Sequence, residues 1–490
     1  MASSLNRSAA RLLLSIISAV TLGSCSSSSL SNAITITHVT VINATGAAAR
    51  PDSNVVIQGT RILAVGPAAA TAIPRDARIV DGSGRFLIPG LADMHLHQTG
   101  ASEPAGSREF IIPLLIANGI TTVRDMGGKV EYLKALRTEI DSGKRMGPQI
   151  FFTGPYLDGN PPSFQPSIVA QNAAEAIAGV QKLKGEGVDF IKVQSRLQPE
   201  AYYAIARESQ KQGIRFVGHV PDSITAAAAS DAGQASIEHL TGVLLGCSTR
   251  EEELRRRQLK RPPVGETPRK TLARQRIWQR DLLDSYSEER ASRLFQKFAA
   301  NHTWQVPTLP LLIRLAYLVP ENDRIDDPRL KYIPGNLRNI WNQSRGGLLD
   351  MRTETDFALR RRLIHQSLSA VKAMKETGIS IMAGTDATAP NVFPGFSLHE
   401  DLSYLVEAGL TPIQALQAAT VEPAEFLGRS AEQGTIAAGK RADVVLLDAN
   451  PLEDIQNTQK IQAVILKGKL FQRSDLDALL SGVERFAAAH

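Results

Sequence analysis

The central part of this 490-residue chain alternates short apolar runs with longer helical patterns, and this alternation limits the fold more than any other feature. From Pro89 to about Gly428, runs of strand length precede helical patterns such as 175–184, 200–211 and 363–375. Such alternation is typical of βαβ units and a parallel sheet. Eight units can be counted, which predicts an α/β fold, a (β/α)8 TIM barrel. The expected strands are 87–95, 121–125, 150–153, 190–193, 216–219, 236–239, 304–309 and 379–384.

The two chain ends have the pattern of strands without helices. Residues 34–88 and 434–473 alternate apolar and polar positions between glycine, asparagine and proline. We therefore expect a small β-sandwich domain built from both ends, residues 31–88 and 429–475, followed by a C-terminal tail, 476–490. The barrel, 89–428, is longer than the ~250 residues typical of the fold. An insertion at about 245–300, after the sixth strand, accounts for the surplus.

The formal net charge of +6 comes from one segment. Residues 250–280 hold eleven Lys or Arg and four Asp or Glu, a net of +7. Charge runs such as 255–257 and 260–261 are typical of a solvated helical face. Because no basic stripe with interleaved aromatic residues occurs elsewhere, nucleic-acid binding is not expected.

The first thirty residues have the features of an export signal and tether. Arg7 and Arg11 precede an apolar stretch, 12–22, which is shorter than the about 20 residues that span a bilayer. The stretch ends Leu22-Gly23-Ser24-Cys25, which resembles a bacterial lipobox and implies lipidation of Cys25. An ordinary cleaved signal with a chance cysteine is the alternative. We expect export, as a lipoprotein on the periplasmic side of a bacterial membrane, or as a soluble periplasmic or secreted protein.

Cysteine usage leaves stability to the apolar core. Cys247 is the one cysteine besides Cys25, so no intramolecular disulfide is expected once Cys25 is lipidated or removed. The membrane would be contacted only through the lipid anchor. The barrel does not require a dimer, and a homo-oligomer stays open.

His95-Leu96-His97 follows the first apolar run of the barrel. A strand has a period of two, so both imidazoles point to the same side and can chelate a metal ion. Two surface histidines at this spacing also occur by chance. Here the pair closes a strand that looks buried, where two unpaired imidazoles would be costly to desolvate without a ligand.

Four more strand ends carry residues of the same chemistry. Lys192 lies in an apolar strand, where desolvation favours the neutral amine, which can add carbon dioxide to form a carbamate. His219 and His239 each end a short apolar run, and Asp386 closes the last strand after Gly384. The structural alternatives are a lysine paired with a buried carboxylate, histidines bonded to backbone, and a helix N-cap aspartate.

The order HxH, Lys, His, His and Asp resembles the amidohydrolase superfamily, in its branch of imidazolonepropionase-like enzymes and metal-dependent Xaa-Pro and Xaa-Arg dipeptidases. The likeness covers nearly the whole chain after the export signal. The motifs that carry it are Ile88-Pro89-Gly90-Leu91, Thr121-Thr122-Val123-Arg124-Asp125, Gly218-His219-Val220, Ile237-Glu238-His239, Ala383-Gly384-Thr385-Asp386-Ala387, Thr411-Pro412 to Thr420, and Gly434-Thr435-Ile436 to Asp443.

The resemblance implies a binuclear hydrolase. His95, His97 and Asp386 would hold the more buried metal, and His219 and His239 the second, with N6-carboxylated Lys192 bridging them. Two such cations can share a hydroxide that is formed near neutral pH. Asp386 would take the proton of this nucleophile and deliver it to the leaving nitrogen. Zinc suits this ligand set, and manganese or iron are alternatives.

Two stretches depart from the dipeptidase pattern. Val193-Gln194-Ser195-Arg196 replaces a glycine-rich turn, and the stretch after the third strand, 153–159, lacks a histidine-bearing glycine loop. We expect Tyr156, Arg124 and Arg196 on loops at the catalytic face, where an arginine could clamp a substrate carboxylate. Internal pairing of these arginines is the alternative.

Three functions are compatible with these residues. The first is an exported peptidase or amidase that cleaves a dipeptide or N-acyl amino acid. The second is another hydrolase on the same site: a cyclic amidase, a lactonase, or a deaminase with one metal and an uncarboxylated Lys192. The third, which the complete ligand set disfavours, is a binding lipoprotein without turnover.

Overall fold

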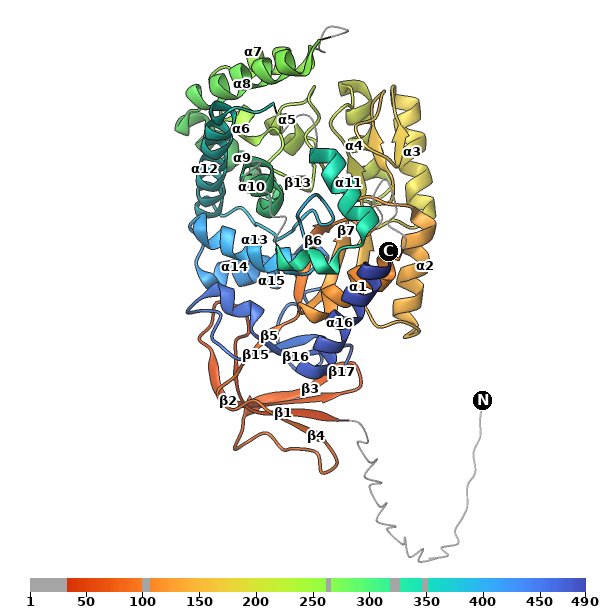
Figure 1. Cartoon of the computed structure of the whole chain (residues 1–490), viewed down its shortest axis with the longest axis vertical. Coiled ribbons are helices and arrows are strands. Elements are labelled where there is room, and N and C mark those ends of the chain that lie inside the picture. The colour runs from red at the N-terminus through yellow and green to blue at the C-terminus, as the bar shows by residue number, and fades with distance from the viewer. Residues whose placement is uncertain (1–32, 99–105, 261–265, 318–326, 346–350) are drawn as a thin grey trace, which may run out of the picture.

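The computed structural model describes residues 33–98, 106–260, 266–317, 327–345 and 351–490 (Figure 1). The expected export signal and Cys25 lie outside the described residues. Within the described ranges, none of the helices has the length and apolar character that crossing a bilayer requires.

Seven parallel strands and one closing segment form the barrel. Neighbouring strands pair in parallel within two groups, one of three and one of four barrel strands, and the groups meet where the Asp189 amide donates to the Phe152 carbonyl (2.9 Å). The strands are β6 (Leu91–Leu96), β7 (Ile120–Asp125), β8 (Gln149–Phe152), β11 (Ile191–Val193), β12 (Phe216–Gly218), β13 (Ser236–Glu238) and β14 (Trp304–Val306).

The eighth expected strand, 379–384, is an irregular segment that closes the ring. It pairs with both neighbours through single bridges, one between Gln305 and Ile381 and one between Leu96 and Ala387. The Met94 amide donates to the Ala383 carbonyl at 2.9 Å. The barrel predicted from the sequence is therefore confirmed, although its last strand is shorter than expected.

The first expected strand, 87–95, is divided between two sheets. Residues Phe86–Pro89 form β5 of the sandwich, and β6 of the barrel begins at Leu91. The break falls at Gly90, whose amide donates to the Asp443 carbonyl (2.8 Å) and whose Cα lies so close to Thr121 that a Cβ atom would clash. The Pro89-Gly90 pair within this apolar run marks the change of partner, because proline and glycine are typical of chain breaks and turns.

Apolar helix faces cover the barrel. In α9 (Glu288–Ala300), Ala291, Leu294, Phe295 and Phe298 follow the helical period and are buried in the main core. The other helices around the ring are α1 (Ser107–Ala117), α2 (Val130–Asp141), α3 (Ala173–Glu186), α4 (Pro199–Lys211), α5 (Ala226–Asp231), α12 (Glu354–Glu376), α13 (Phe396–Glu407), α14 (Pro412–Ala418) and α15 (Val421–Phe426).

The chain ends meet in the β-sandwich domain, as predicted. The order of its strands is β17-β16-β15-β5-β1-β2-β3, and β4 also pairs with β1. Inward residues such as Ile36, Val444 and Ile465 share one apolar core. The strands besides β5 are β1 (Ile34–Val41), β2 (Arg50–Gln58), β3 (Arg61–Pro67), β4 (Arg78–Asp81), β15 (Val444–Leu447), β16 (Ile461–Leu466) and β17 (Lys469–Gln472).

Several short elements lie between the barrel strands and helices along the chain. Two short strands follow β8, namely β9 (Tyr156–Asp158) and β10 (Ser167–Val169). Two helices, α10 (Leu309–Tyr317) and α11 (Gly335–Arg345), precede α12, and two 3-10 turns, Pro328–Tyr332 and Ile455–Gln459, complete the described elements. The expected strand 304–309 thus ends at Val306, because the chain turns into α10 at Leu309.

The insertion after the sixth strand is smaller than the predicted 245–300. Because α9 is a barrel helix, only α6 (Val243–Gly246), α7 (Glu251–Leu259) and α8 (Pro268–Asp284) remain as additions. Figure 1 shows α7 and α8 at the end of the molecule opposite the sandwich. The expected solvated basic face exists in part: the Arg256 side chain is exposed, whereas Arg255 is buried and pairs with Glu251.

The expected C-terminal tail is a docked helix. Residues Arg473–Ala489 form α16, which packs against α1 and buries Leu476 and Val483 in the main core. A capping box at Gln472 and Asp475 begins the helix. The prediction of a tail was wrong because the apolar positions of this segment recur at helical spacing.

We expect Leu476→Ala to lower the free energy of unfolding by about 2–5 kcal/mol, the cost of truncating a buried leucine. Leu480→Ala is the matched control, because Leu480 lies on the same helix and is only half-buried. Thermal unfolding followed by circular dichroism measures both. Equal changes in Tm would show that α16 is not part of the core.

Candidate metal centre

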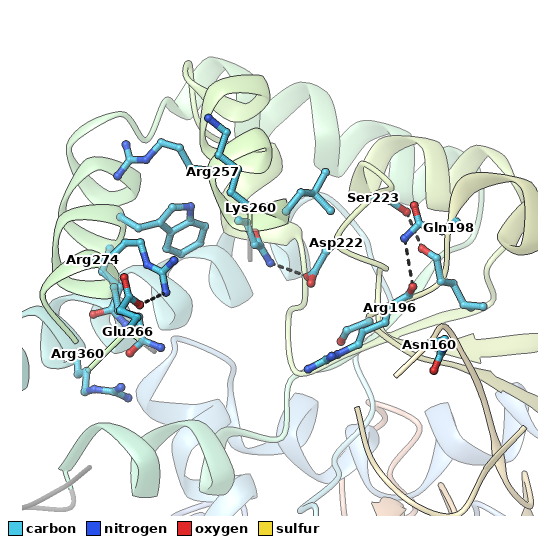
Figure 2. Close-up of a pocket in the computed structure, with 17 residues that line it drawn as sticks. Asn160, Arg196, Gln198, Asp222, Ser223, Arg257, Lys260, Glu266, Arg274 and Arg360 are labelled. Carbon is cyan, nitrogen blue, oxygen red and sulfur yellow. Dashed lines mark hydrogen bonds and ion pairs between the residues drawn. The ribbon is translucent and has the colours of Figure 1, made fainter. Parts of the chain in front are cut away.

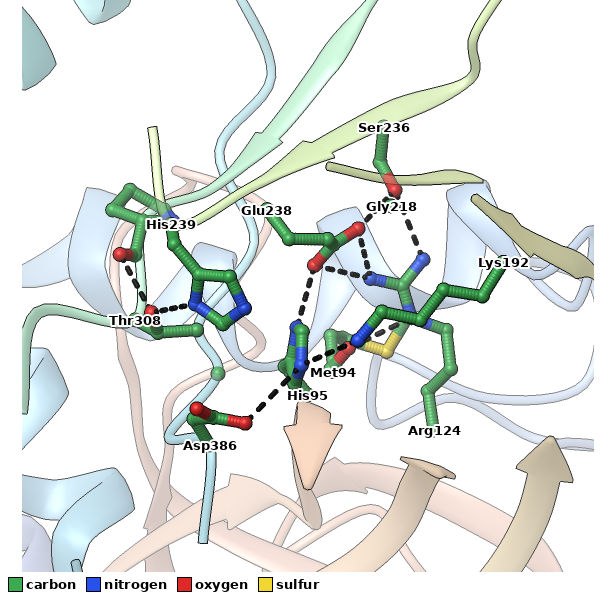
Figure 3. A network of polar contacts seen from close by, with 12 residues as sticks. Met94, His95, Arg124, Lys192, Gly218, Ser236, Glu238, His239, Thr308 and Asp386 are labelled. Atoms are coloured by element: carbon green, nitrogen blue, oxygen red, sulfur yellow. Dashed lines mark hydrogen bonds and ion pairs between the residues drawn. The ribbon is translucent and has the colours of Figure 1, made fainter. Parts of the chain in front are cut away.

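Six side chains converge at the carboxyl ends of the barrel strands. His95 lies near the end of β6 and His97 follows it, Lys192 lies in β11, and the other three side chains follow β12, β13 and the closing segment. Figure 3 shows His95, Lys192, His239 and Asp386 directed toward one space. The last members of the set are His97 and His219.

His95, His97 and Asp386 form the tightest group. Asp386 Oδ1 lies 3.3 Å from His95 Nε2 and 3.0 Å from His97 Nε2. One ligand atom from each of the three lies within 4.8 Å of the others, so together they could hold a metal ion. Imidazole and carboxylate are ligands that suit zinc and related divalent metals.

Lys192 and the other two histidines continue this group. The Lys192 amine lies 3.2 Å from His95 Nε2. The ring centroids of His95 and His239 are 4.5 Å apart, and those of His219 and His239 are 5.0 Å apart. All six residues expected as ligands are therefore neighbours, with Lys192 beside His95.

Hydrogen bonds fix the orientation of the first two imidazoles. His95 Nδ1 lies 2.8 Å from Glu238 Oε2, and His97 Nδ1 lies 3.2 Å from the Gly127 carbonyl. Both partners are acceptors, so each Nδ1 carries the hydrogen and each Nε2 presents its lone pair. Second partners of this kind are what hold histidine ligands around a metal.

The second pair of imidazoles is oriented by hydroxyl groups. His219 Nδ1 lies 3.0 Å from Ser195 Oγ, and His239 Nδ1 lies 2.6 Å from Thr308 Oγ1. Each hydroxyl donates its own hydrogen to a carbonyl oxygen, at 3.1 Å and 2.8 Å respectively. Both hydroxyls therefore accept from Nδ1, and both Nε2 atoms are left for a ligand.

Burial sets the protonation states of the cluster. It lowers the pKa of Lys192 to about 8, and burial with the nearby His95 lowers the pKa of His239 to about 3. Burial opposes the charge of Asp386, but the histidines around it outweigh burial and hold its pKa well below the usual value. Neutral imidazoles beside one carboxylate form a set ready to bind a cation.

Glu238 is a functional residue that the sequence analysis did not single out. Its carboxylate is fully buried and accepts from His95 and from Arg124, whose Nη2 lies 2.9 and 3.1 Å from its two oxygens. Burial raises the pKa of Glu238, but Arg124 and His95 outweigh burial and lower it to about 2. The sequence could have indicated this residue by its position. Glu238 directly precedes His239 at the end of a strand, where alternate side chains point to one side.

Arg124 does not lie on a loop at the catalytic face. It belongs to β7, is fully buried, and also donates to the Met94 carbonyl (2.7 Å) and to Ser236 (3.2 Å). The expectation of a substrate clamp at Arg124 is thus contradicted, and the internal pairing considered as its alternative is found. A buried guanidinium needs such partners, because an unpaired charge there would be strongly destabilising.

Two further buried aspartates hold the backbone of the ligand strands. Asp93 accepts from the hydroxyl of Thr385 (2.7 Å), and Asp125 accepts from the amides of Gln98 (2.7 Å) and Gly127 (3.1 Å). Burial raises the pKa of Asp93 to about 7 and that of Asp125 to about 6. Both carboxyls fix the segments that carry His95, His97 and Asp386.

Tyr156 and Arg196 occupy different places around the centre. Tyr156 begins β9, is buried, and its ring centroid lies 6.3 Å from that of His97. Arg196 is exposed and lines an open cavity of about 1050 Å³ (Figure 2). The far wall of this cavity comes from the insertion and includes Arg257 and Trp278.

The amidohydrolase family model matches residues 86–278 and 314–471 of this chain. An imidazolonepropionase of Paracidovorax citrulli is 26% identical over 438 residues, which is 86% of this chain and 91% of that protein. An ochratoxinase of Aspergillus niger is 36% identical over 115 residues, and this match spans only 23% of the ochratoxinase and 22% of this chain.

A solved structure shares the fold over most of the chain. A Xaa-Pro dipeptidase with bound methionine superposes with a TM-score of 0.63 at 20% identity, covering 90% of this chain and all of that one (100%). At this identity the likeness supports the barrel-and-sandwich architecture described above.

Replacing the carboxylate behind His95 tests whether the cluster is a metal centre. We expect Glu238→Gln to weaken zinc binding by about 10–100-fold, because partners behind the ligands contribute that much to affinity. Competition with a chelating dye measures the dissociation constant. Glu252→Gln, on the exposed face of α7, is the control. Unchanged zinc affinity in a variant with native circular dichroism would contradict the assignment.

Proposed function

The chain belongs to the amidohydrolase family and is a metal-dependent hydrolase of carbon–nitrogen bonds, and from this premise we propose that it cleaves the amide bond of a dipeptide or N-acyl amino acid with two metal ions. The observation that carries the proposal is the convergence of four imidazoles, Lys192 and Asp386 on one space. When bound, two divalent cations would supply a hydroxide near neutral pH and polarise the scissile carbonyl.

The four histidines would hold the ions through their Nε2 atoms. His95 and His97 would share one ion with Asp386, since these three side chains are already in contact. His219 and His239 would hold the other. Zinc fits this set, and manganese or iron are compatible with the same ligands.

We propose that Lys192 is N6-carboxylated. Its side chain is 1% exposed, and the lowered pKa of its amine increases the neutral fraction that can attack carbon dioxide. The amine nitrogen forms a bond to the carbon and releases a proton, which leaves an anion with two oxygens. This anion would reach both ions from β11, between the two histidine pairs.

Asp386 would move the proton of the reaction. Its carboxylate ionises readily and faces the space enclosed by the histidines (Figure 3). It would accept the proton of the nucleophilic water and deliver it to the leaving nitrogen. The carboxyl of Asp386 would thus act once as a base and once as an acid.

One observation supports a second function, a deaminase or cyclic amidase with a single ion. His95, His97 and Asp386 alone satisfy the geometry of a three-ligand site, and the imidazolonepropionase matches over most of both chains. Lys192 would then stay an amine. The number of ions and the dependence on carbon dioxide distinguish the two functions.

We also propose export of the protein, which rests on the segment from Arg7 to Cys25 alone. An exported hydrolase would meet short peptides on the periplasmic side. Lipidation of Cys25 would then keep the enzyme at the membrane without a spanning helix.

We expect the zinc- or manganese-loaded protein to release amine from dipeptides or N-acylated amino acids, with cyclic amides and lactones as comparison substrates. His97→Ala should lower kcat/KM by about 10³-fold, because a catalytic ion contributes several kcal/mol. His302→Ala, an exposed histidine outside the centre, should match the wild type. Equal activity in the His97 variant would contradict metal-dependent cleavage at this site.

Lys192→Ala should bind at most one ion per chain and lose activity, and a short carboxylic acid such as propionate should restore part of it. The acid would replace the missing carbamate between the ions. Elemental analysis and rates with and without propionate measure this, with Lys182→Ala on the surface of α3 as control. Full activity of Lys192→Ala without carbon dioxide or acid would favour the single-ion function.

A further inference from the structure

The open cavity of Figure 2 continues into a smaller hollow beside the metal centre. Five residues line both spaces: Ser195, Asp222, Gln258, Trp278 and Arg360. The smaller hollow has a volume of about 300 Å³ and includes His239 in its wall. A ligand that enters through the cavity can therefore reach the ligand histidines.

The smaller hollow is mainly aliphatic. Leucines from the loop after β13 and from α6, α8, α10 and α12 line it: Leu240, Leu244, Leu245, Leu282, Leu312, Leu315 and Leu363. The aliphatic part of this wall would select a group by its apolar volume, while polar residues such as Ser195, Thr241 and Ser367 line the rest. The insertion contributes part of this wall, so the hollow is built by this chain's own additions to the barrel.

Arg360 lies where the open cavity and the smaller hollow join. It lies on α12, is half-buried, and has no carboxylate within ion-pair distance among the described residues. Its Nη1 donates to the Leu315 carbonyl at 3.4 Å, and burial with the nearby Arg352 lowers its pKa to about 10. Asp356 on the same helix offsets part of this shift but is paired with Arg276, so the Arg360 guanidinium is available to an anion that enters the cavity.

Two other arginines of the cavity wall already form ion pairs. Arg257 contacts Asp281 at 2.7 Å, and Arg274 contacts Glu266 at 2.9 Å. Arg196, from the opposite wall in Figure 2, has no ion-pair partner among the residues described. Arg196, Arg360 and the exposed Lys260 are thus the cations of the cavity wall that have no ion pair among the described residues, and Arg360 is the one of the three that also lines the smaller hollow.

We propose that the substrate is an N-acyl amino acid or dipeptide whose free carboxylate is bound by Arg360, with Arg196 opposite, and whose bulky aliphatic side chain fills the hollow beside His239. This inference rests on the proposed amide hydrolysis and names its substrate class. A planar guanidinium binds a carboxylate through two parallel hydrogen bonds. The amide nitrogen, which is bonded to the same Cα as these two recognised groups, would then lie near His239.

The test compares acetate release from three substrates. We expect kcat/KM for N-acetyl-L-leucine to exceed that for N-acetyl-L-alanine by at least about 10-fold, the lower bound for one methylene in a fitted apolar pocket. N-acetyl-L-leucinamide, which lacks the negative charge, should be about 10–100-fold poorer, as expected for loss of a hydrogen bond to a charged group.

Two variants separate the charge from the apolar hollow. Arg360→Gln should lower kcat/KM for N-acetyl-L-leucine by about 10–100-fold and leave the value for the leucinamide nearly unchanged. Arg361→Gln is the control, because Arg361 pairs with Glu354 and does not line either space. Leu312→Phe should reduce the preference for leucine over alanine by filling the hollow.

A binding measurement tests the inference without turnover. Trp278 lines both spaces, so its fluorescence should change saturably with N-acetyl-L-leucine in the wild type, at about 10–100-fold higher concentration in Arg360→Gln, and not in Trp278→Phe. If wild type releases acetate but Arg360→Gln and the leucinamide are unaffected, the inference is overturned and the hydrolysis stands. If no substrate is cleaved but binding depends on Arg360, the proposed hydrolysis fails and the ligand assignment stands. Binding that ignores both Arg360 and the carboxylate overturns the inference.

Discussion

The buried contact of Glu238 with His95 and Arg124 is the interaction on which the rest of the centre depends. A carboxylate without exposure can stay ionised only because a guanidinium and an imidazole share it. The same contact places the hydrogen of His95 on Nδ1 and turns Nε2 toward Lys192 and Asp386. The barrel interior therefore does not merely support the ligands. It determines which nitrogen of His95 faces the reacting atoms.

In the proposed function, the residues that would bind the metal and those that would select the substrate lie on different parts of the molecule. The ligands stand on barrel strands, whose positions are fixed by parallel pairing and by a continuous core. The walls of the cavity and hollow come from the insertion, from α10 and α12, and from the loops that follow β9, β11 and β12, all outside the strands themselves. Changes in these walls would alter the side chain or charge that is accepted, while the metal centre stays the same.

Much of this architecture could be predicted from the sequence, because strand ends and helix faces leave local patterns. The barrel, the sandwich from both ends and the convergence of His95, His97 and Asp386 follow from such patterns. The environment of the Arg124 side chain could not be predicted, because the sequence pattern of a charged residue in a strand is the same whether it binds a ligand or pairs with a residue such as Glu238. Helix α16 does leave a local signal, since its buried residues Leu476 and Val483 are seven residues apart, two helical turns, whereas the cavity depends on contacts between segments far apart in the chain and has none.

The ligand residues also show where the fold gives up stability for geometry. His239 has φ 56° and Asp386 has φ 61°, left-handed values that cost non-glycine residues on the order of 1–3 kcal/mol each. Gly218, before His219, has φ 125° and packs so closely on the Val193 carbonyl that a side chain would clash there. At these strand ends the chain departs from the extended path and turns the imidazole or carboxylate inward. Such positions persist only because the surrounding pairing and packing exceed their cost, so the large core is a condition for the centre and not only for the fold.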